Sequence, residues 1–352
     1  MSCAHNHSDM DQPISSYGAD ESGLICGYLF QEGQPPAAID SRAAAQDMAA
    51  IRAQDTAHGT PSRFIWLHFN LAHAGAMRWM ERHAGLSQAF YDALRDELRS
   101  TRIERDEQAL VAVMNDVHFH FTFEPTDIST LWVSLDSRVV VTARHSPLRS
   151  VDQLRIAIKR GGTLHSSVEL LERLLRAQAD VLVDIVRGAT RQVDKIEDEL
   201  LSNRLNLKRS SLGALRRVLV RLQRLLAPEP ASLFRLLAHP PSWMTVMDAQ
   251  QLREATEEFS MVLQDMASLQ ERIKLLQEEV AAMVNERNSA SLFVLTVMTV
   301  LALPINILAG LFGMNVGGVP LAGNDHGFWV VAAIVAAFTL VAGWLAFRRR
   351  DP

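Results

Sequence analysis

The residues whose side chains could most readily take part in chemistry lie on one face of an otherwise apolar segment near the C-terminus. Steps of three or four residues along a helix bring together hydroxyl, amide and small side chains. The members of this polar stripe are Leu292, Thr296, Thr299, Leu303, Asn306 and Gly310. A membrane helix with Asn and Thr on one face usually turns that face toward other helices or toward water. One copy of the stripe cannot enclose a channel, but several copies around an axis can.

The loop after the stripe offers oxygen ligands for a cation. It opens with Gly313, Met314 and Asn315, and the stripe before it has no acidic side chain. A divalent ion would therefore pass at least partly hydrated, held by amide and backbone carbonyl oxygens. A ring of Asn315 carbonyl groups at the mouth suits such an ion. Asp325 and His326, the titratable groups of the loop, could collect cations or accept a proton.

Two uncharged segments position this loop. Residues 292–312 hold 21 positions without a charge, residues 328–347 hold 20, and the loop at 313–327 has 15. Each segment is about 30 Å long as a helix, which matches the hydrocarbon core of a bilayer. They predict a transmembrane hairpin whose second helix, with Thr339 and two tryptophans as its hydrogen-bonding side chains, faces lipid. In an alternative role, Asn306 and the threonines only hold helices together.

Basic residues predict the orientation. Three arginines in the tail at 348–352 follow the second segment, and Arg272, Lys274 and Arg287 precede the first, whereas the loop has neither Lys nor Arg. Positive charge favours the cytoplasmic side, so both termini should be cytoplasmic. The polar N-terminus lacks the apolar run of a cleavable signal peptide.

The rest of the chain predicts an α+β/α architecture. We expect a disordered tail at 1–20, a cytoplasmic α/β domain at 21–147 and a helical region at 148–247. Strands are predicted at 23–30, 63–70, 109–115, 117–124, 130–136 and 138–143, and helices at 39–54, 73–99, 150–161, 166–201, 202–226 and 231–239. The helix at 202–226 is rich in arginine and predicts a solvated or intersubunit face.

No Pro or Gly interrupts the sequence from Asp248 to Leu303, which predicts one helix over 248–312. Its first part, a stalk at 248–291, carries an apolar seam with intervals of three or four residues. The seam consists of Leu252, Ala255, Phe259, Leu263, Met266, Leu269, Ile273, Leu276, Val280 and Met283. Because a helix of about 100 Å is too long for one soluble domain to bury, we expect it to pack with copies of itself.

The remaining features of the sequence give only a weak indication of a second metal site, and they argue against nucleic-acid binding and catalysis. His118 and His120 would share a face of a strand, a spacing that can serve a metal, although a solvated or packing role is favoured because no further ligands are evident. The net charge of −5 implies no general affinity for nucleic acid. The sequence has no P-loop, nucleophile elbow or paired-carboxylate motif, so we do not expect an enzyme.

The motif at the loop resembles that of the CorA family of divalent-metal transporters. The family places Gly-Met-Asn at the end of the first of two C-terminal membrane helices. The extended form Gly-Met-Asn-Val-Gly-Gly-Val-Pro is similar to the ZntB branch, which is associated with zinc. Supporting matches are Pro304, the lead-in at 309–312, Leu-Leu-Ala-Pro at 225–228 and the stretch at 271–279.

The resemblance implies a funnel-shaped homopentamer in the bacterial inner membrane, with a pore lined by the first span and a periplasmic loop. Gly313, Met314 and Asn315 would be the selectivity filter, and Asn306 would match a polar pore position. No cofactor is implied, and the transported ion would be Zn²⁺, with Mg²⁺, Co²⁺, Ni²⁺ or Cd²⁺ as alternatives. Uptake, proton coupling and regulation by bound metal stay open, as does a membrane scaffold that moves no ion.

Overall fold

The computed structural model describes seven stretches of the chain. They are residues 18–53, 63–95, 100–106, 109–124, 127–201, 209–314 and 326–348. The chain divides into two compact units, Met1–Lys274 and Leu275–Pro352. Most of the predicted tail at 1–20 lies outside the described residues.

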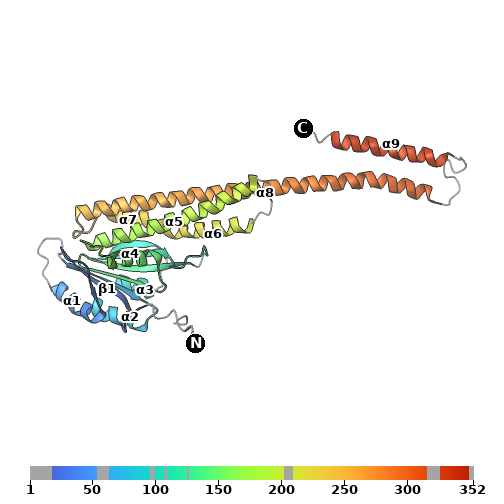
Figure 1. The fold of residues 1–352 in the computed structure, drawn as a ribbon. Helices are drawn as coiled ribbons and strands as arrows, with labels where there is room; N and C mark the ends of the chain where they lie inside the picture. The colour runs from blue at the N-terminus through green and yellow to red at the C-terminus, as the bar shows by residue number, and fades with distance from the viewer. Residues whose placement is uncertain are drawn as a thin grey trace, which may run out of the picture. The chain divides into compact units, whose positions relative to one another are not determined.

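A seven-stranded sheet forms the centre of the first unit (Figure 1). Its strands are β1 (Leu24–Gln31), β2 (Ala37–Ile39), β3 (Arg63–Asn70), β4 (Arg102–Asp106), β5 (Ala109–Val117), β6 (Ile128–Leu135) and β7 (Val139–Arg144). The order is β2-β1-β3-β7-β6-β5-β4, and the pair β3–β7 is parallel while the others are antiparallel. The central strands are rich in Val, Leu and aromatic residues and are buried on both faces, which explains their nearly continuous apolar sequences.

Short helices cover one face of the sheet. They are α1 (Ser41–Ala53), α2 (Ala74–Trp79), a π-helical turn at Met80–Ala84 and α3 (Gln88–Arg95). Their side chains pack on Ile65, Leu67 and Val141 to form a hydrophobic core. A single helix over 73–99 was therefore a wrong prediction, because Gly85 adopts a left-handed conformation with φ of 53° and ends the first helical segment.

Longer helices lie on the other face (Figure 1). They are α4 (Arg149–Lys159), α5 (Ser167–Leu201), α6 (Arg209–Leu226), α7 (Pro228–Ala238) and the first part of α8 (Val246–Phe312). The predicted helix at 231–239 begins earlier in the structure, because Pro228 and Pro230 lie in the first turn of α7. The first turn of a helix needs no N–H donor from these residues.

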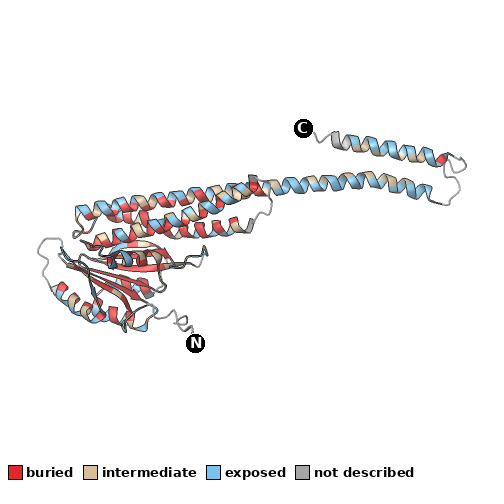
Figure 2. Ribbon diagram, viewed as in Figure 1, coloured by how far each residue is buried: buried red, intermediate tan, exposed pale blue. Residues whose placement is uncertain are grey.

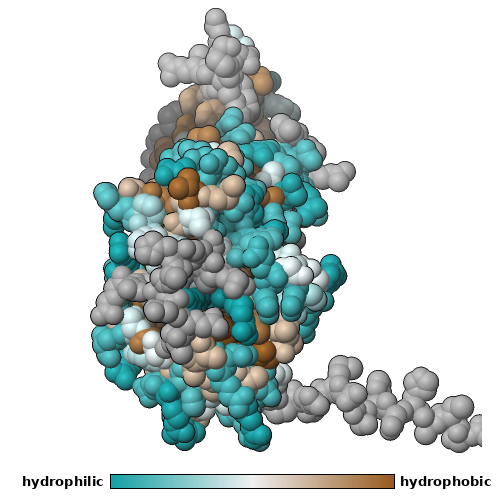
Figure 3. Space-filling model, turned by 90° about the vertical axis from the view of Figure 1, so that its left-hand side faces the viewer, coloured by the Kyte–Doolittle hydropathy of each residue, from teal (hydrophilic) through white to brown (hydrophobic). Residues whose placement is uncertain are grey.

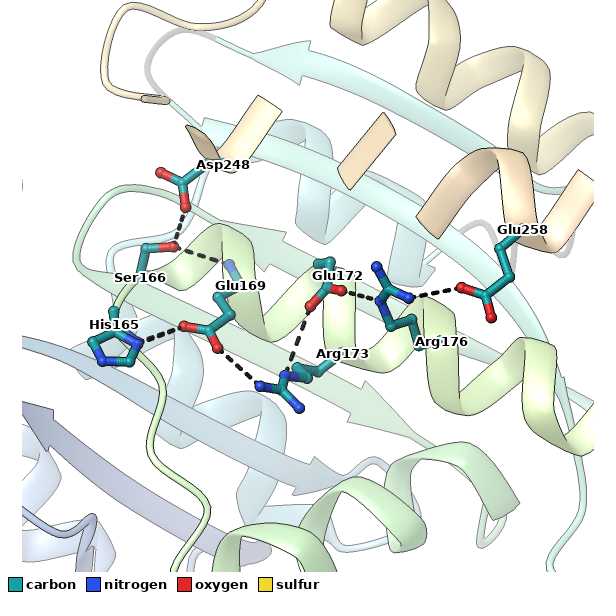
Figure 4. A network of polar contacts seen from close by, with 8 residues as sticks. All are labelled: His165, Ser166, Glu169, Glu172, Arg173, Arg176, Asp248 and Glu258. Atoms are coloured by element: carbon teal, nitrogen blue, oxygen red, sulfur yellow. Dashed lines mark hydrogen bonds and ion pairs between the residues drawn. The ribbon is translucent and has the colours of Figure 1, made fainter. Parts of the chain in front are cut away.

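Polar contacts show that α5 and the start of α8 run in the same direction. Ser166 donates to Asp248 at 2.5 Å, and Arg176 donates to Glu258 at 2.7 Å. These contacts belong to a wider network around the first turns of α5 (Figure 4). Further along both helices, Arg272 binds the carboxylates of Asp194 and Glu197.

The apolar seam of α8 is buried within the single chain, which corrects the expectation that copies must cover it. The side chains of Leu252, Phe259 and Ile273 have no exposed surface. The sequence shows that the seam is apolar, but it does not show that α5 lies beside it. The predicted helix itself is confirmed, because α8 continues for 67 residues from Val246 to Phe312.

The second unit contains the remainder of α8 and α9 (Gly327–Arg348). Each helix has an apolar window long enough to cross a bilayer, and at most 6% of either window is buried. Figure 2 shows this exposure as pale blue ribbon. The predicted pair of apolar C-terminal helices is confirmed.

Candidate functional site

The polar stripe of α8 is exposed in the single chain. Leu292 is 63% exposed and Leu303 is 59% exposed, and Thr296, Asn306 and Gly310 are also exposed. The other side of the same segment is partly covered, since Val297, Leu301, Ile305 and Leu308 are half-buried. The face with hydroxyl and amide groups is therefore open in the single chain, as are apolar residues outside the stripe such as Met298 at 63% and Val300 at 58%.

The two threonines of the stripe orient their hydroxyl groups in the same way. The Oγ1 atoms of Thr296 and Thr299 donate to the carbonyl oxygens of Leu292 and Leu295, each at 2.8 Å. A hydroxyl that donates to its own helix needs no other acceptor in an apolar environment. Its lone pairs stay available, so this arrangement favours a cation or the hydrogen atoms of a water molecule.

The C-terminal end of the stripe combines backbone oxygens with the loop motif. Pro304 lies inside α8 and has no N–H, so it removes one hydrogen bond of the helical ladder. Gly313 follows the helix and still donates its N–H to the carbonyl of Ala309 at 2.9 Å, and Met314 is exposed. Asn315 and Asp325 lie outside the described residues. His326 is exposed directly before α9, and its carbonyl accepts from the N–H of Val330.

Helix α9 has no comparable polar stripe. The hydroxyl of Thr339 donates to the carbonyl of Val335 at 2.8 Å. Trp329 and Trp344 are exposed near the two ends of the helix, at 70% and 58%. They are about 22 Å apart along the axis, a spacing typical of aromatic residues at the two interfaces of a bilayer.

The first unit holds buried acidic residues that the sequence did not indicate. Glu229 has no exposed surface, and burial together with the negative charge of Asp116 raises the pKa of Glu229 well above its ordinary value. Burial also raises the pKa of Asp116 to about 6, against hydrogen bonds from Ser150 and the N–H of Val117. Both shifts favour the protonated form of these two carboxyl groups over the charged form.

The predicted pair of histidines is not formed. Strand β5 ends at Val117, His118 makes an isolated bridge with Leu148, and His120 lies in an exposed turn. The two side chains therefore do not share a strand face, and the predicted strand at 117–124 was wrong. Among the described residues, no three His, Cys, Asp or Glu side chains come together as metal ligands.

Residues 61–349 match the family described as CorA-like Mg²⁺ transporter protein. The chain belongs to the CorA-like Mg²⁺ transporter family. This membership agrees with the predicted resemblance and with the prediction that the chain is not an enzyme.

Individual CorA-like relatives match nearly the whole chain. The divalent cation transporter CmaX of Pseudomonas aeruginosa is 28% identical over 333 residues, which cover 94% of this chain and 97% of CmaX. The zinc transport protein ZntB of Yersinia enterocolitica is 23% identical over 287 residues, covering 81% of this chain and 88% of ZntB.

Solved CorA-like structures share the fold. The structure of full-length CmaX superimposes with a TM-score of 0.75 at 29% identity, covering 94% of this chain and 98% of CmaX. The CorA magnesium transporter from Methanocaldococcus jannaschii gives a TM-score of 0.71 at 18% identity, covering 93% and 98%.

Proposed function

We propose that this chain transports divalent metal cations across the bacterial inner membrane, with zinc as its main ion. The observation that carries the proposal is the exposed polar stripe of α8, which leads directly into Gly313 and Met314. Membership of the CorA-like family and the similarity to CmaX and ZntB support it.

In this proposal five copies assemble around an axis, and the first span of each turns its stripe inward. In such an assembly the stripes enclose a water-filled pore, whereas the stripe of a single hairpin would face lipid. The side chains that face the pathway are Leu292, Thr296, Thr299, Leu303, Asn306 and Gly310. Gly313, Met314 and Asn315 form the filter at the periplasmic mouth, and both termini stay in the cytoplasm. Mass photometry of the detergent-solubilised protein tests the number of copies.

The chemistry of the stripe favours a hydrated ion over a tightly bound one. It offers hydroxyl, amide and carbonyl oxygens, whereas tight zinc sites use nitrogen and sulfur ligands. The ion would keep part of its water shell while it passes Asn306 and Asn315. Asp325 and His326 would attract cations to the mouth. The zinc preference rests on the resemblance to ZntB, and a broader channel for Mg²⁺, Co²⁺, Ni²⁺ or Cd²⁺ is the second candidate.

The test is zinc flux into proteoliposomes that contain the purified protein and a zinc-responsive dye. Zinc uptake that survives an excess of magnesium and grows with an imposed proton gradient is the expected result. Uptake that magnesium blocks and the gradient does not change would favour the broader channel. If no divalent cation is transported, the result would contradict the transport proposal and favour the role as a membrane scaffold.

A further inference from the structure

The first unit contains an open cavity that includes none of the residues proposed to line the ion pathway. It lies between the sheet and α6 and has a volume of about 410 Å³. This volume falls within the range typical of sites for small ligands. The lining residues are Asn115, His118, Ile128, Ser129, Thr130, Trp132, His145, Ser146, Arg221 and Leu225.

The floor of the cavity is rigid because its polar groups are occupied. The side-chain amide of Asn115 donates to Thr101 Oγ1 at 2.9 Å, and its oxygen accepts from Thr130 Oγ1 at 3.3 Å. Trp132 donates its indole N–H to the carbonyl of Ala93 at 3.1 Å. Asn115, Thr130 and Trp132 are at most 3% exposed. They shape the cavity, but their bonds leave little capacity for a ligand.

The rim offers donors that are not occupied. Within the described stretches of the chain, Arg221 has no carboxylate within ion-pair distance, and its side chain is exposed. Two imidazoles and two serine hydroxyls line the same space, and the lining includes no Asp or Glu. The His145 ring meets the Trp132 ring edge-on, with centroids 5.6 Å apart. One side of the cavity is thus rich in hydrogen-bond donors and lacks negative charge.

The carboxylate of Asp127, which interacts with His118 on this rim, is held by its own loop. Asp127 interacts with His118, but its carboxylate already accepts hydrogen bonds from the N–H and Oγ1 of Thr122 and from the N–H of Glu124. These bonds hold the carboxylate at its own loop. The guanidinium of Arg221 therefore stays available to a ligand.

We propose that this cavity binds a small phosphate-bearing anion. A planar guanidinium can bind two oxygens of a phosphoryl group at once, and imidazole and hydroxyl groups can donate to the remaining oxygen. The ligand would join Arg221 on α6 to His118 and His145 at the edge of the sheet. Thr101 already bonds the carbonyl of Leu225 on α6 at 2.6 Å, so the ligand would add to an existing link between α6 and the sheet.

Helix α5 is also connected to the cavity. The amide of Gln178 donates to the carbonyl of Asn115 at 2.6 Å. Asn115 therefore links the floor of the cavity to the helix that runs beside the start of α8. A phosphate-bearing ligand would stabilise the arrangement of the sheet, α5 and α6 in the first unit.

The test measures binding to the detergent-purified full chain by isothermal titration calorimetry. Inorganic phosphate and ADP are the two probes, and uncharged adenosine is the control ligand. Saturable binding of phosphate would identify a site for the free ion. Tighter binding of ADP than of phosphate would identify an organic phosphate. Both results support the proposal, whereas equal binding of adenosine and ADP would contradict it.

Matched variants locate the binding. Arg221→Gln should weaken binding by roughly tenfold or more, because it removes a charged hydrogen-bond donor. Arg217→Gln changes an exposed arginine one turn earlier on α6 that does not line the cavity, and it should change the affinity less than about twofold. Arg221 is exposed, so its variant should fold normally, which circular dichroism checks.

Two outcomes would overturn the proposal. One is the absence of binding of both phosphate and ADP at millimolar concentration. The other is equal affinity in wild type and Arg221→Gln. Because the readout is binding rather than ion flux, it is independent of whether the chain transports zinc.

Discussion

The two units of this chain differ in how far they bury their leucine side chains. Leu252 on the first part of α8 has no exposed surface, whereas Leu340 on α9 is 74% exposed. Figure 3 shows a face of the molecule on which hydrophilic side chains predominate. The first unit thus buries its apolar side chains within the single chain, whereas the second unit leaves many of them exposed. Exposed apolar helices of this length need lipid or other copies around them.

Polar side chains show the same contrast. In the first unit, the buried ring of His68 contacts Thr142 at 2.8 Å and accepts from Arg144 at 3.0 Å, which links neighbouring strands. In the second unit, the threonines donate only to carbonyls one turn away on their own helix. Hydrogen bonds hold the first unit together across its elements. In the second unit the hydrogen bonds stay within each helix, so the oxygen atoms on the polar face of α8 can still accept from water or bind a cation.

The strongest test of the contrast removes a leucine from each unit. Leu252→Ala should lower the free energy of unfolding by about 2–5 kcal/mol, because it leaves a cavity in a packed core. Leu340→Ala removes a side chain that the chain does not cover, and it should change stability by less than about 0.5 kcal/mol. Urea unfolding followed by circular dichroism measures both. Equal effects would mean that the two units are packed alike.

A buried acid in the first unit predicts a dependence of stability on pH. Because the pKa of folded Glu229 lies well above its ordinary value of 4.5, the folded chain keeps a proton there that the unfolded chain loses. Stability should therefore fall as the pH rises above about 4.5. Glu229→Gln removes the contribution of Glu229 to this dependence, while that of Asp116 remains, and it should raise the melting temperature more at pH 8 than at pH 5.

The control for this variant is Glu257→Gln, which changes an exposed acid on α8. It should leave the shape of the pH profile unchanged in a thermal melt. A larger melting-temperature gain for Glu229→Gln at pH 5 than at pH 8 would contradict a protonated buried carboxyl.

A third prediction concerns the hydroxyls of the second unit. Replacing Thr296 and Thr299 together by valine keeps the shape of α8 and removes two oxygens from its exposed face. Divalent-cation flux into proteoliposomes should fall severalfold, because the ion loses ligands along the stripe. Thr339→Val makes the same change on α9 and should leave the flux unchanged. A loss of flux in both would indicate a role in helix packing.

The smallest effect is expected at the contact between α5 and α8. Arg272 is 39% exposed on its side chain and binds Asp194 and Glu197. Exposed ion pairs contribute little, so Arg272→Gln should lower the free energy of unfolding by about 1 kcal/mol or less. A urea titration measures this change, and a loss comparable with that of Leu252→Ala would show that charge, rather than the apolar seam, holds the two helices together.

The sequence predicted the elements whose signals are local and long. Helix α8 follows from a stretch without Pro or Gly up to Pro304, and the stripe follows from its period. The sequence did not predict features that depend on partners. The seam of α8 did not reveal that α5 covers it, and Gly85 did not look like a break within 73–99. Strand β4 carries a charged sequence, Arg102–Asp106, and gave no apolar alternation.

The cavity in the first unit was missed for a related reason. Arg221 lies about a hundred positions after His118, and only the packing of α6 against the sheet brings them together. The basic helix and the histidine were each visible in the sequence, but no spacing rule joins them. The filter residue Asn315 was predicted from its motif and lies outside the described residues, so its role stays a prediction.

The most direct measurement is zinc flux through Asn315→Ala in proteoliposomes, compared with Asn324→Ala. Both variants remove one amide from the loop at 313–327, but only the first changes the proposed filter. The account predicts that Asn315→Ala abolishes most of the flux while the oligomer stays intact, and that Asn324→Ala transports zinc like the wild type. Wild-type flux in Asn315→Ala would contradict the filter, and with it the assignment of the polar stripe as the path of the ion.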